Sequence, residues 1–443
     1  MSYLTQPRKS TKIPNGIPYI IGNELAERFS FYGMKCILII FMTQYLLDPR
    51  GNANPMNNNE ATYWYHMFTS AVYFTPIFGA LLSDVFLGKY KTILLLSTIY
   101  CLGHFSLAID ETKWGLSFGL ILISIGAGGI KPCVSSHVGD QFGITNSHHM
   151  SKVFSWFYLS INLGAFISTL LTPYLLHNHG PSLAFGIPGI LMLLATYLFW
   201  KGRRSFVHIP PKGLRVFKDL LSKNGLKSIF KLSIIYIFIS IFWSLFDQTG
   251  STWVLQAEKL NRNWLGINWY SSQIQAINPI MILILVPLFS YYIYPFLNNY
   301  FKLTPLMKIN IGLFLAIPSF IIIGLLEKWI NLGLTPSIGW QILAYIILTA
   351  SEVLISITCL EFSYTQAPTS IKSVIMGLFL LSVSLGNIIT AIINNVILNN
   401  DGTSKLPGEM YYYFFAFLML ITSLLFIFVF KYYKEEIYLH DEK

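Results

Sequence analysis

Twelve long apolar stretches are the strongest constraint on how this chain can fold. A transmembrane helix needs about 20 consecutive apolar residues to cross the hydrocarbon core of a bilayer, and each stretch reaches that length. We therefore predict an all-α membrane protein with twelve transmembrane helices. The expected spans lie near residues 17–47, 61–83, 92–110, 114–139, 152–177, 181–200, 232–256, 270–297, 304–326, 337–362, 371–398 and 410–432.

The composition supports a membrane protein over a soluble one. Hydrophobic residues make up 54% of the 443 residues and charged residues only 11%, whereas about a quarter of a typical soluble domain is charged. Residues 1–16 are polar and lack the apolar core of a cleavable signal peptide. The four cysteines lie in apolar runs without paired spacing, so neither a disulfide framework nor a zinc site is expected.

Lysine and arginine fall mainly in the loops on one side of the predicted membrane, which accounts for most of the net charge of +10. Such loops face the cytoplasm, so both termini are expected there, and the protein in the cytoplasmic (inner) membrane. The stretch 201–231 is strongly basic and is predicted to be a linker that lies along anionic lipid. The predicted parts are a cytoplasmic tail, a six-helix bundle, the linker, a second six-helix bundle and a second tail, at residues 1–16, 17–200, 201–231, 232–432 and 433–443.

Residues 79–91, between the second and third spans, read GALLSDVFLGKYK. They fit the loop found at this place in the major facilitator superfamily. Glycine permits close helix approach, while Asp84 and the basic residues can pair on the cytoplasmic side. With the six-plus-six layout, this predicts a major facilitator fold and a structural or gating role for the loop.

Catalytic and nucleotide-binding motifs are missing from the sequence. Gly126 to Pro132 resembles a phosphate loop only superficially, because it lacks the Gly-Lys-Ser/Thr ending and lies within a span. No zinc-protease motif or Gly-x-Ser-x-Gly elbow is present. An enzyme is therefore disfavoured and no cofactor is expected, which leaves a transporter driven by an ion gradient as the leading class.

Glu24, Glu27 and Arg28 lie in the middle of the first span at offsets of zero, three and four, which places them on one helix face. A charge at the centre of a bilayer costs roughly 2.5–3.5 kcal/mol, so three of them indicate a functional site. Both halves of the chain contribute further ionisable residues within spans. These are Lys35, His66, Lys131, Asp247 and Glu352.

The position of each ionisable residue along its span predicts two groups. Lys35, His66 and Asp247 fall in the outer parts of their spans and are expected to form an outer cluster. Lys131 and Glu352 lie deeper, at the level of the Glu24 triplet. A site at the bilayer midplane between two halves is typical of repeat-built transporters, and acids and bases in one cavity titrate together, which lets protonation select a conformation.

Five segments together resemble the proton-dependent oligopeptide transporter family, and they cover nearly the whole chain in the family's order. Glu24 to Gly33 (ELAERFSFYG) is similar to its E-x-x-E-R-F-x-Y-Y-G signature. The other four are residues 126–142, similar to the span 4 motif, residues 157–164 (FYLSINLG), residues 242–253 and residues 351–368. The resemblance implies a twelve-helix major facilitator fold that imports di- and tripeptides together with protons by alternating access.

The resemblance also implies a role for each candidate residue. Arg28 and Lys131 would receive the peptide carboxylate and Glu352 the ammonium, and the further substrate-binding residues would be Tyr32, Tyr73, Asn162, Trp243 and Asn278. The proton-coupling residues would be Glu24, Glu27, His66, Asp247 and Glu352. Lys35 and Asp247 would form an outer gating salt bridge.

Two aromatic positions depart from the family pattern: Phe31 replaces the first signature tyrosine, and Phe379 stands where a pocket tryptophan is common. Alternatives to peptide import stay open, namely another small anionic or zwitterionic solute (an amino acid, nitrate or a peptide-like compound) and a non-transporting sensor. From the residues alone, Lys35 with Asp247 also fits a static bridge, and the aromatic residues fit ordinary packing. The expected partners are peptide, protons and membrane lipid, without nucleic acid, and the expected functional form is a monomer.

Overall fold

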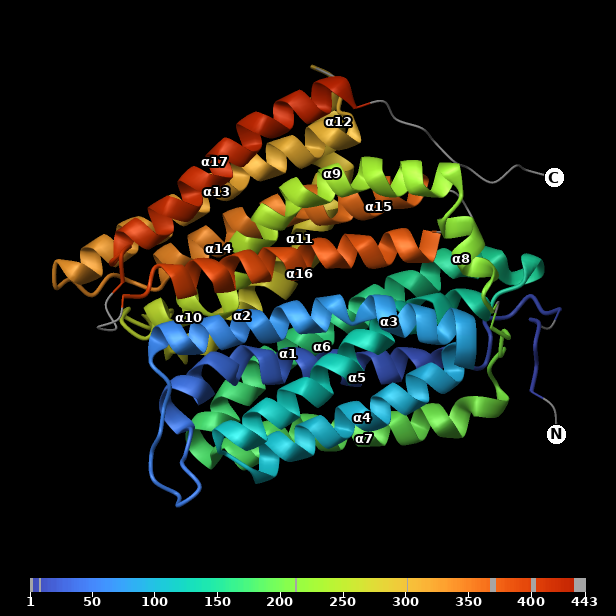
Figure 1. The fold of residues 1–443 in the computed structure, drawn as a ribbon, viewed down its shortest axis with the longest axis horizontal. Coiled ribbons are helices and arrows are strands. Elements are labelled where there is room, and N and C mark those ends of the chain that lie inside the picture. The colour runs from blue at the N-terminus through green and yellow to red at the C-terminus, as the bar shows by residue number, and fades with distance from the viewer. Residues whose placement is uncertain are drawn as a thin grey trace. The chain divides into compact units, whose positions relative to one another are not determined.

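The computed structural model describes residues 3–7, 9–211, 213–300, 302–366, 372–399 and 404–433. These residues are mainly helical (Figure 1), and one short hairpin is present, in which β1 (Asn263–Trp264) pairs antiparallel with β2 (Ile267–Asn268). Parts of the predicted features lie outside the described residues. They are residues 1, 2 and 8 of the predicted N-terminal tail, Lys212 of the predicted linker, residues 367 and 368 of the last family-like segment, residue 371 of the predicted span 371–398, and residues 434–443 of the predicted C-terminal tail.

The chain divides into two compact units. The first unit contains Met1–Pro55 and Ala71–Ser222, and the second contains Met56–Ser70 and Lys223–Lys443. Helix α2 (Asn58–Phe74) is therefore shared, because its first residues group with the second unit. The predicted domain boundaries, which assign this whole helix to the first bundle, stay a prediction.

In the first unit, α4 packs on α5 and α7, and α1 packs on α6 and α7 (Figure 1). Close approach depends on glycine: a Cβ on Gly79 would overlap the backbone of Gly129, and one on Gly164 would lie 2.6 Å from the Leu25 carbonyl oxygen. The helices are α1 (Ile17–Ile40), α3 (Pro76–Leu81), α4 (Lys89–Ile109), α5 (Lys113–Asp140), α6 (Met150–His179), α7 (Pro181–Lys201) and the short α8 (Arg215–Leu220).

In the second unit, α13 packs on α14 and α17, and α9 packs on α16. A π-helical turn, Val353–Ile357, follows α14 directly after Glu352, and such turns are frequent at functional sites. The helices are α9 (Lys223–Phe246), α10 (Thr252–Ala257), α11 (Ile277–Leu288), α12 (Tyr294–Asn298), α13 (Pro305–Asn331), α14 (Gly339–Glu352), α15 (Thr358–Thr365), α16 (Lys372–Val396) and α17 (Glu409–Tyr432).

Eleven helical segments among the described residues are long and apolar enough to cross a membrane. Helix α1 is the twelfth by length, since its 24 residues extend about 36 Å at the usual rise of 1.5 Å per residue, but Glu24, Glu27, Arg28 and Lys35 interrupt its apolar character. The predicted all-α membrane architecture is confirmed. The helix predicted at 232–256 begins earlier, at Lys223, because a helix can continue beyond the membrane edge where hydropathy falls.

Candidate functional site

The charged triplet of α1 is an ion-paired cluster inside the first unit. The Arg28 Nε lies 2.7 Å from Glu24 Oε1, to which it donates a hydrogen bond, and 3.2 Å from Glu27 Oε2. Both glutamates are 1% exposed, and the Arg28 side chain is 12% exposed. One guanidinium therefore serves two buried carboxylates, so an acid that takes up a proton weakens its hold on Arg28.

Lys131 projects from α5 between two aromatic rings of the same unit. Its Nζ lies 4.1 Å from the ring centroid of Phe31 and 4.4 Å from that of Tyr73, which are distances for cation–π attraction. Glu27 and Arg28 act on Lys131 electrostatically. Phe31, one of the two departures from the family pattern, thus keeps an aromatic face for the lysine without a hydroxyl.

Helix α5 can present Lys131 because the preceding glycines let the neighbouring helix come close. A Cβ on Gly128 would overlap the Thr75 hydroxyl, and that hydroxyl donates a 2.6 Å hydrogen bond to the Ser124 carbonyl oxygen of α5. Pro132 lies inside the helix directly after the lysine. The glycines and the proline therefore fix where the Lys131 side chain leaves α5.

The other candidates of the first unit are less closely joined. Tyr32 is half-buried and packs edge-on against Phe31. The Asn162 side chain is buried on α6 and donates a 3.0 Å hydrogen bond to the Tyr158 carbonyl oxygen of its own helix. Lys35 is also buried, one to two turns beyond Arg28 on α1. The structure thus places Lys131 between Phe31 and Tyr73 and within electrostatic reach of Arg28, and it does not join Asn162 to them by a hydrogen bond among the described residues.

Glu352 of the second unit is held by an amide. Asn278 Nδ2 on α11 donates a 2.6 Å hydrogen bond to Glu352 Oε2 on α14, and it lies 3.2 Å from the Thr349 hydroxyl one turn earlier. The predicted pair of Asn278 and Glu352 is therefore brought together. An amide can donate to the carboxylate and still leave its second oxygen available, which an ion pair with a buried cation would not do as readily.

His66 and Asp247 are linked through Asn387, a residue that the sequence analysis missed. Asn387 Nδ2 donates a 2.7 Å hydrogen bond to Asp247 Oδ2, and its Oδ1 lies 2.7 Å from His66 Nδ1. The second ring nitrogen, His66 Nε2, lies 2.9 Å from the Ser251 hydroxyl. An asparagine in the middle of the apolar stretch 371–398 was the available signal, but its partners lie 140 and 321 positions away.

The described ring contacts of Trp243 and Phe379 are with other aromatic residues of the second unit, and the substrate-binding role of Trp243 stays a prediction. The Trp243 ring lies against Phe242 and Phe246 at centroid distances of 5.2 and 5.5 Å. Phe379 is buried and its ring lies 6.2 Å from that of Tyr236. The predicted gate assigns Lys35 to one unit and Asp247 to the other, and it stays a prediction.

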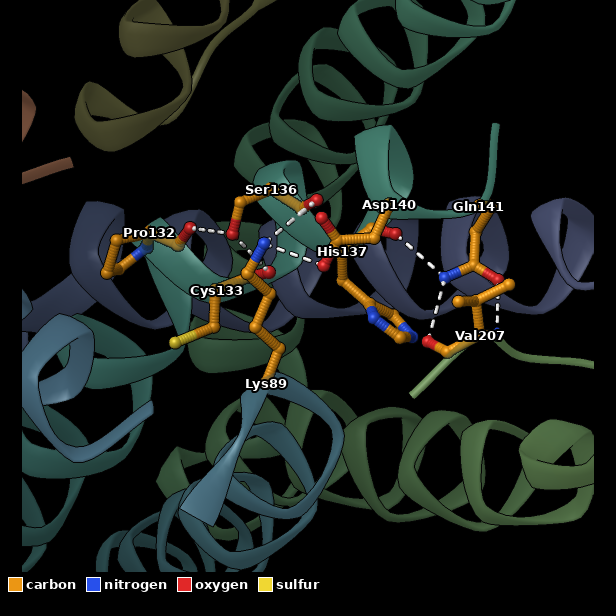
Figure 2. Close-up of polar contacts among 8 residues, drawn as sticks. All are labelled: Lys89, Pro132, Cys133, Ser136, His137, Asp140, Gln141 and Val207. Carbon is orange, nitrogen blue, oxygen red and sulfur yellow. Dashed lines mark hydrogen bonds and ion pairs between the residues drawn. The ribbon is translucent and has the colours of Figure 1, made fainter. Parts of the chain in front are cut away.

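The loop motif at residues 79–91 forms an ion pair with the C-terminal end of α5. Figure 2 shows Lys89, whose Nζ lies 2.6 Å from Asp140 Oδ2 and 3.5 Å from the Ser136 carbonyl oxygen. In the same view, Gln141 Nε2 donates to the Val207 carbonyl oxygen and Gln141 Oε1 accepts from the Val207 N–H at 2.9 Å. The sequence indicated basic residues in a pairing role here but not Asp140 as the partner.

Comparison with known proteins places these features in one family. The family model described as the POT family matches residues 90–224 and 218–410. Peptide transporter family 1 of Drosophila melanogaster is 37% identical over 361 residues, which cover 71% of this chain and 48% of that protein. Human solute carrier family 15 member 2 is 36% identical over 369 residues, covering 72% and 49%. The chain thus spans about half the length of these curated relatives.

Solved structures match over almost the whole chain. An auto-inhibited POT family peptide transporter has a TM-score of 0.88 and 33% identity, with 97% of this chain and 99% of that chain covered. The POT family transporter PepTSo has a TM-score of 0.85 and 34% identity, covering 95% and 98%. The major facilitator fold expected from the sequence is confirmed, and the chain belongs to the POT family of proton-dependent oligopeptide transporters.

Proposed function

We propose that the protein is a proton-coupled symporter that imports di- and tripeptides by alternating access. The observation that carries the proposal is the division of buried charge: Arg28 and Lys131 supply two cations in the first unit, and Glu352 supplies an acid in the second. A short peptide of any sequence has one carboxylate, one ammonium and amides. Such a division reads the two ends of the peptide and tolerates varied side chains.

Arg28 connects peptide binding to the proton. A peptide carboxylate can replace Glu24 or Glu27 as partner of the guanidinium, which binds carboxylates in a bidentate manner. The displaced glutamate is then a buried carboxylate without its cation, and taking up a proton removes that penalty. Peptide and proton therefore favour each other's binding, which is the reciprocal coupling that symport requires.

Lys131 and Glu352 complete the roles at the peptide ends. Lys131 adds a second cation for the carboxylate, with its position fixed by Phe31 and Tyr73. Glu352 binds the ammonium through one carboxylate oxygen, while Asn278 donates a hydrogen bond to the other oxygen, Oε2. The remaining residues that we propose for the substrate are Tyr32, Asn162 and Trp243. His66 and Asp247, joined by Asn387, are the proposed outer proton site, and Lys35 with Asp247 the proposed gate.

The setting of the protein in the cell is part of the proposal. The excess of lysine and arginine in the loops on one side supports a cytoplasmic membrane location with both termini in the cytoplasm. The basic stretch 201–231 supports contact with anionic lipid. A monomer is the proposed functional form, because each unit supplies its share of charge from one chain.

Uptake by proteoliposomes tests the proposal. With an inward proton gradient, the wild type is expected to accumulate a labelled dipeptide, and Glu352→Gln or Lys131→Ala to abolish that accumulation. Retained gradient-driven uptake in both variants would contradict the assignment.

Two matched controls are available in the second unit. Lys308→Ala removes another lysine that lies over an aromatic ring, at 4.1 Å from Tyr294. Glu327→Gln changes another buried acid, which accepts a 2.8 Å hydrogen bond from Gln256. Both controls are expected to retain uptake. Competition by a panel of peptides, amino acids and nitrate then separates peptide import from import of another small zwitterion or anion.

A further inference from the structure

Four buried polar side chains of the first unit, near Glu27, have no role in the site described above. On α4, Ser97, Tyr100 and His104 share one face at offsets of zero, three and seven, which extends over about 10.5 Å at the usual rise. On α1, Asn23 lies one turn before Glu27 on the same face. All five residues are at most 2% exposed.

Most polar atoms of these four side chains lack protein partners among the described residues. Neither the two polar side-chain atoms of Asn23 nor the hydroxyls of Ser97 and Tyr100 have a hydrogen bond there. The ring nitrogens of His104 also lack a hydrogen bond of ordinary length, although the backbone of Phe185 on α7 acts on the ring as an acceptor. The Glu27 oxygens likewise accept no hydrogen bond and have only the ion pair with Arg28. Native proteins pair nearly all their buried polar groups, with protein or with ordered water. Buried polar groups that lack such partners in one region, beside Glu27, therefore indicate internal water.

Tyr100 links the α4 side chains to Glu27 on α1. The Tyr100 and His104 rings have centroids 4.8 Å apart. The Tyr100 hydroxyl is within electrostatic reach of Glu27 and Arg28. Helix α7 closes the group: a Cβ on Gly189 would lie 2.9 Å from His104 Cβ, and the Ser30 hydroxyl of α1 donates a 2.6 Å hydrogen bond to the Pro188 carbonyl oxygen. The group thus lies between α1, α4 and α7.

We propose that Asn23, Ser97, Tyr100 and His104 hold a chain of water molecules beside Glu27, and that His104 and Tyr100 pass protons along it. The proton step rests on the proposed function, whereas the water chain does not. The water chain is a route inside the first unit that reaches Glu27 from the side of α4. This route is separate from Lys131 and its two aromatic neighbours, Phe31 and Tyr73, which we propose to bind the substrate.

The proposed relay moves one proton from water to Glu27 and needs no other reactant. An excess proton on one water passes to the unprotonated ring nitrogen of His104, and the other ring nitrogen releases its own proton to the next water. That water donates a proton to the Tyr100 hydroxyl oxygen as the hydroxyl gives its own proton, through a further water, to the Glu27 carboxylate. One proton moves in total and neutralises the carboxylate, and rotation of the ring and of the hydroxyl restores their starting state. Arg28, Glu24 and Lys131 are the charged groups that act on Glu27.

Radiolytic hydroxyl-radical labelling tests the water chain in the purified wild-type protein, because radicals formed from a bound water modify the side chain beside it. Tyr100 and His104 are expected to be labelled severalfold faster than two buried reference residues of the second unit. The references are Tyr345, whose hydroxyl donates to the Thr249 carbonyl oxygen at 2.7 Å, and Tyr236, whose hydroxyl donates to the Ser363 hydroxyl oxygen at 2.7 Å. Labelling no faster than at these references would overturn the water chain.

Transport by variants tests the proton step. His104→Gln and Tyr100→Phe keep shape and, for glutamine, polarity, but neither can pass a proton through. We expect each to lower gradient-driven peptide accumulation by about tenfold or more, since a positioned proton-transfer group contributes roughly 10²–10⁴-fold and bypass through water remains. Peptide counterflow, which needs no net proton movement, is expected to stay at the wild-type rate, and this excludes misfolding.

Tyr90→Phe is the matched control, because it makes the same change on α4 at a ring stacked on Phe199, and it should leave both rates unchanged. Full gradient-driven accumulation in both His104→Gln and Tyr100→Phe would overturn the relay. Loss of counterflow in these variants would also overturn it in favour of a structural role. Failure of the proposed function is distinguishable, since the wild type would then show no peptide counterflow while the labelling result still decides the water chain.

Discussion

The charged candidate residues of the first unit are held by other charges and by aromatic rings, whereas the two candidate acids of the second unit, Glu352 and Asp247, accept hydrogen bonds from amides. Arg28 pairs with Glu24 and Glu27, and Lys131 lies between Phe31 and Tyr73. In the second unit, Asn278 donates to Glu352 and Asn387 donates to Asp247.

The difference matters because the two kinds of support respond differently to a proton. Protonating an acid of the α1 triplet weakens an ion pair, so it changes what Arg28 can bind. An acid that an amide supports can gain a proton while the amide reorients its carbonyl oxygen toward the new O–H group. The first unit is thus suited to exchanging one anion for another, and the second to gaining and losing protons with little rearrangement.

Removing one support from each unit gives the largest expected effect. Arg28→Leu leaves two buried carboxylates without their cation, and breaking a buried ion pair in this way costs about 3–5 kcal/mol. Asn278→Leu removes one donor from Glu352 and is expected to cost about 1–3 kcal/mol. Thermal unfolding of the purified variants in detergent measures the difference. Equal losses of stability would remove the distinction between the units.

Asn387 gives the next largest effect and tests whether the amides of the second unit are tied to its ionisable residues. Asn387→Leu removes a hydrogen bond to a carboxylate, expected to cost about 1.5–3 kcal/mol, and is expected to lower gradient-driven uptake because His66 and Asp247 lose their link. Asn394→Leu is the matched control on the same helix, since Asn394 donates only to neutral oxygens of Thr390 and Tyr411. Its cost should be about 0.5–1.5 kcal/mol, and its uptake should be normal. Normal uptake by both variants would show that the link is structural.

The rings around Lys131 are expected to have a smaller effect. Phe31→Leu removes one aromatic face from the ammonium, and a cation–π contact of this kind contributes about 0.5–2 kcal/mol. A double-mutant cycle with Lys131→Met isolates that energy, because Phe31→Leu should cost less when the ammonium is already gone. Phe379→Leu in the second unit is the control, as its described ring contact is with Tyr236. A coupling free energy of zero between Phe31 and Lys131 would show that the Phe31 ring contributes only ordinary packing.

The sequence predicted best what a single helix determines. Glu24 and Arg28 are four residues apart on α1, so their contact follows from helix geometry, and the long apolar runs predicted the membrane helices. It could not predict partners from distant segments, such as Asp140 for Lys89 or Asn387 for His66 and Asp247. Phe31 shows the same limit: its position was noted as a departure, but its contact with Lys131 depends on how α1 and α5 pack. The sequence pattern shows that a polar group lies in an apolar segment, where its burial is unfavourable. Only the folded structure shows which partner offsets that cost.

The smallest expected effect concerns a contact outside the membrane-spanning helices, between the N-terminal residues Tyr3 and Leu4, here called the strap, and the chain at Val207 and His208. The Leu4 carbonyl oxygen accepts a 2.7 Å hydrogen bond from the His208 N–H, and the Tyr3 and His208 rings stack with centroids 4.2 Å apart. His208 Nε2 also donates to the Arg203 carbonyl oxygen at 2.8 Å. Partial burial lowers the pKa of His208, and this carbonyl opposes the shift.

The docked strap therefore favours neutral His208, and the released strap binds the proton more readily. Docking should be fully favourable above the ordinary histidine pKa of about 6.5 and should weaken as the pH falls through that value. Hydrogen exchange of the His208 amide, corrected for the intrinsic effect of pH on exchange, is expected to show less protection at pH near 5.5 than near 7.5, an interval of about one unit on either side of that pKa. His208→Phe keeps a ring for Tyr3 but cannot take a proton, so its protection should not depend on pH. The amides of α14 serve as the reference, and an equal loss of protection there would mean that acid loosens both units rather than the first alone.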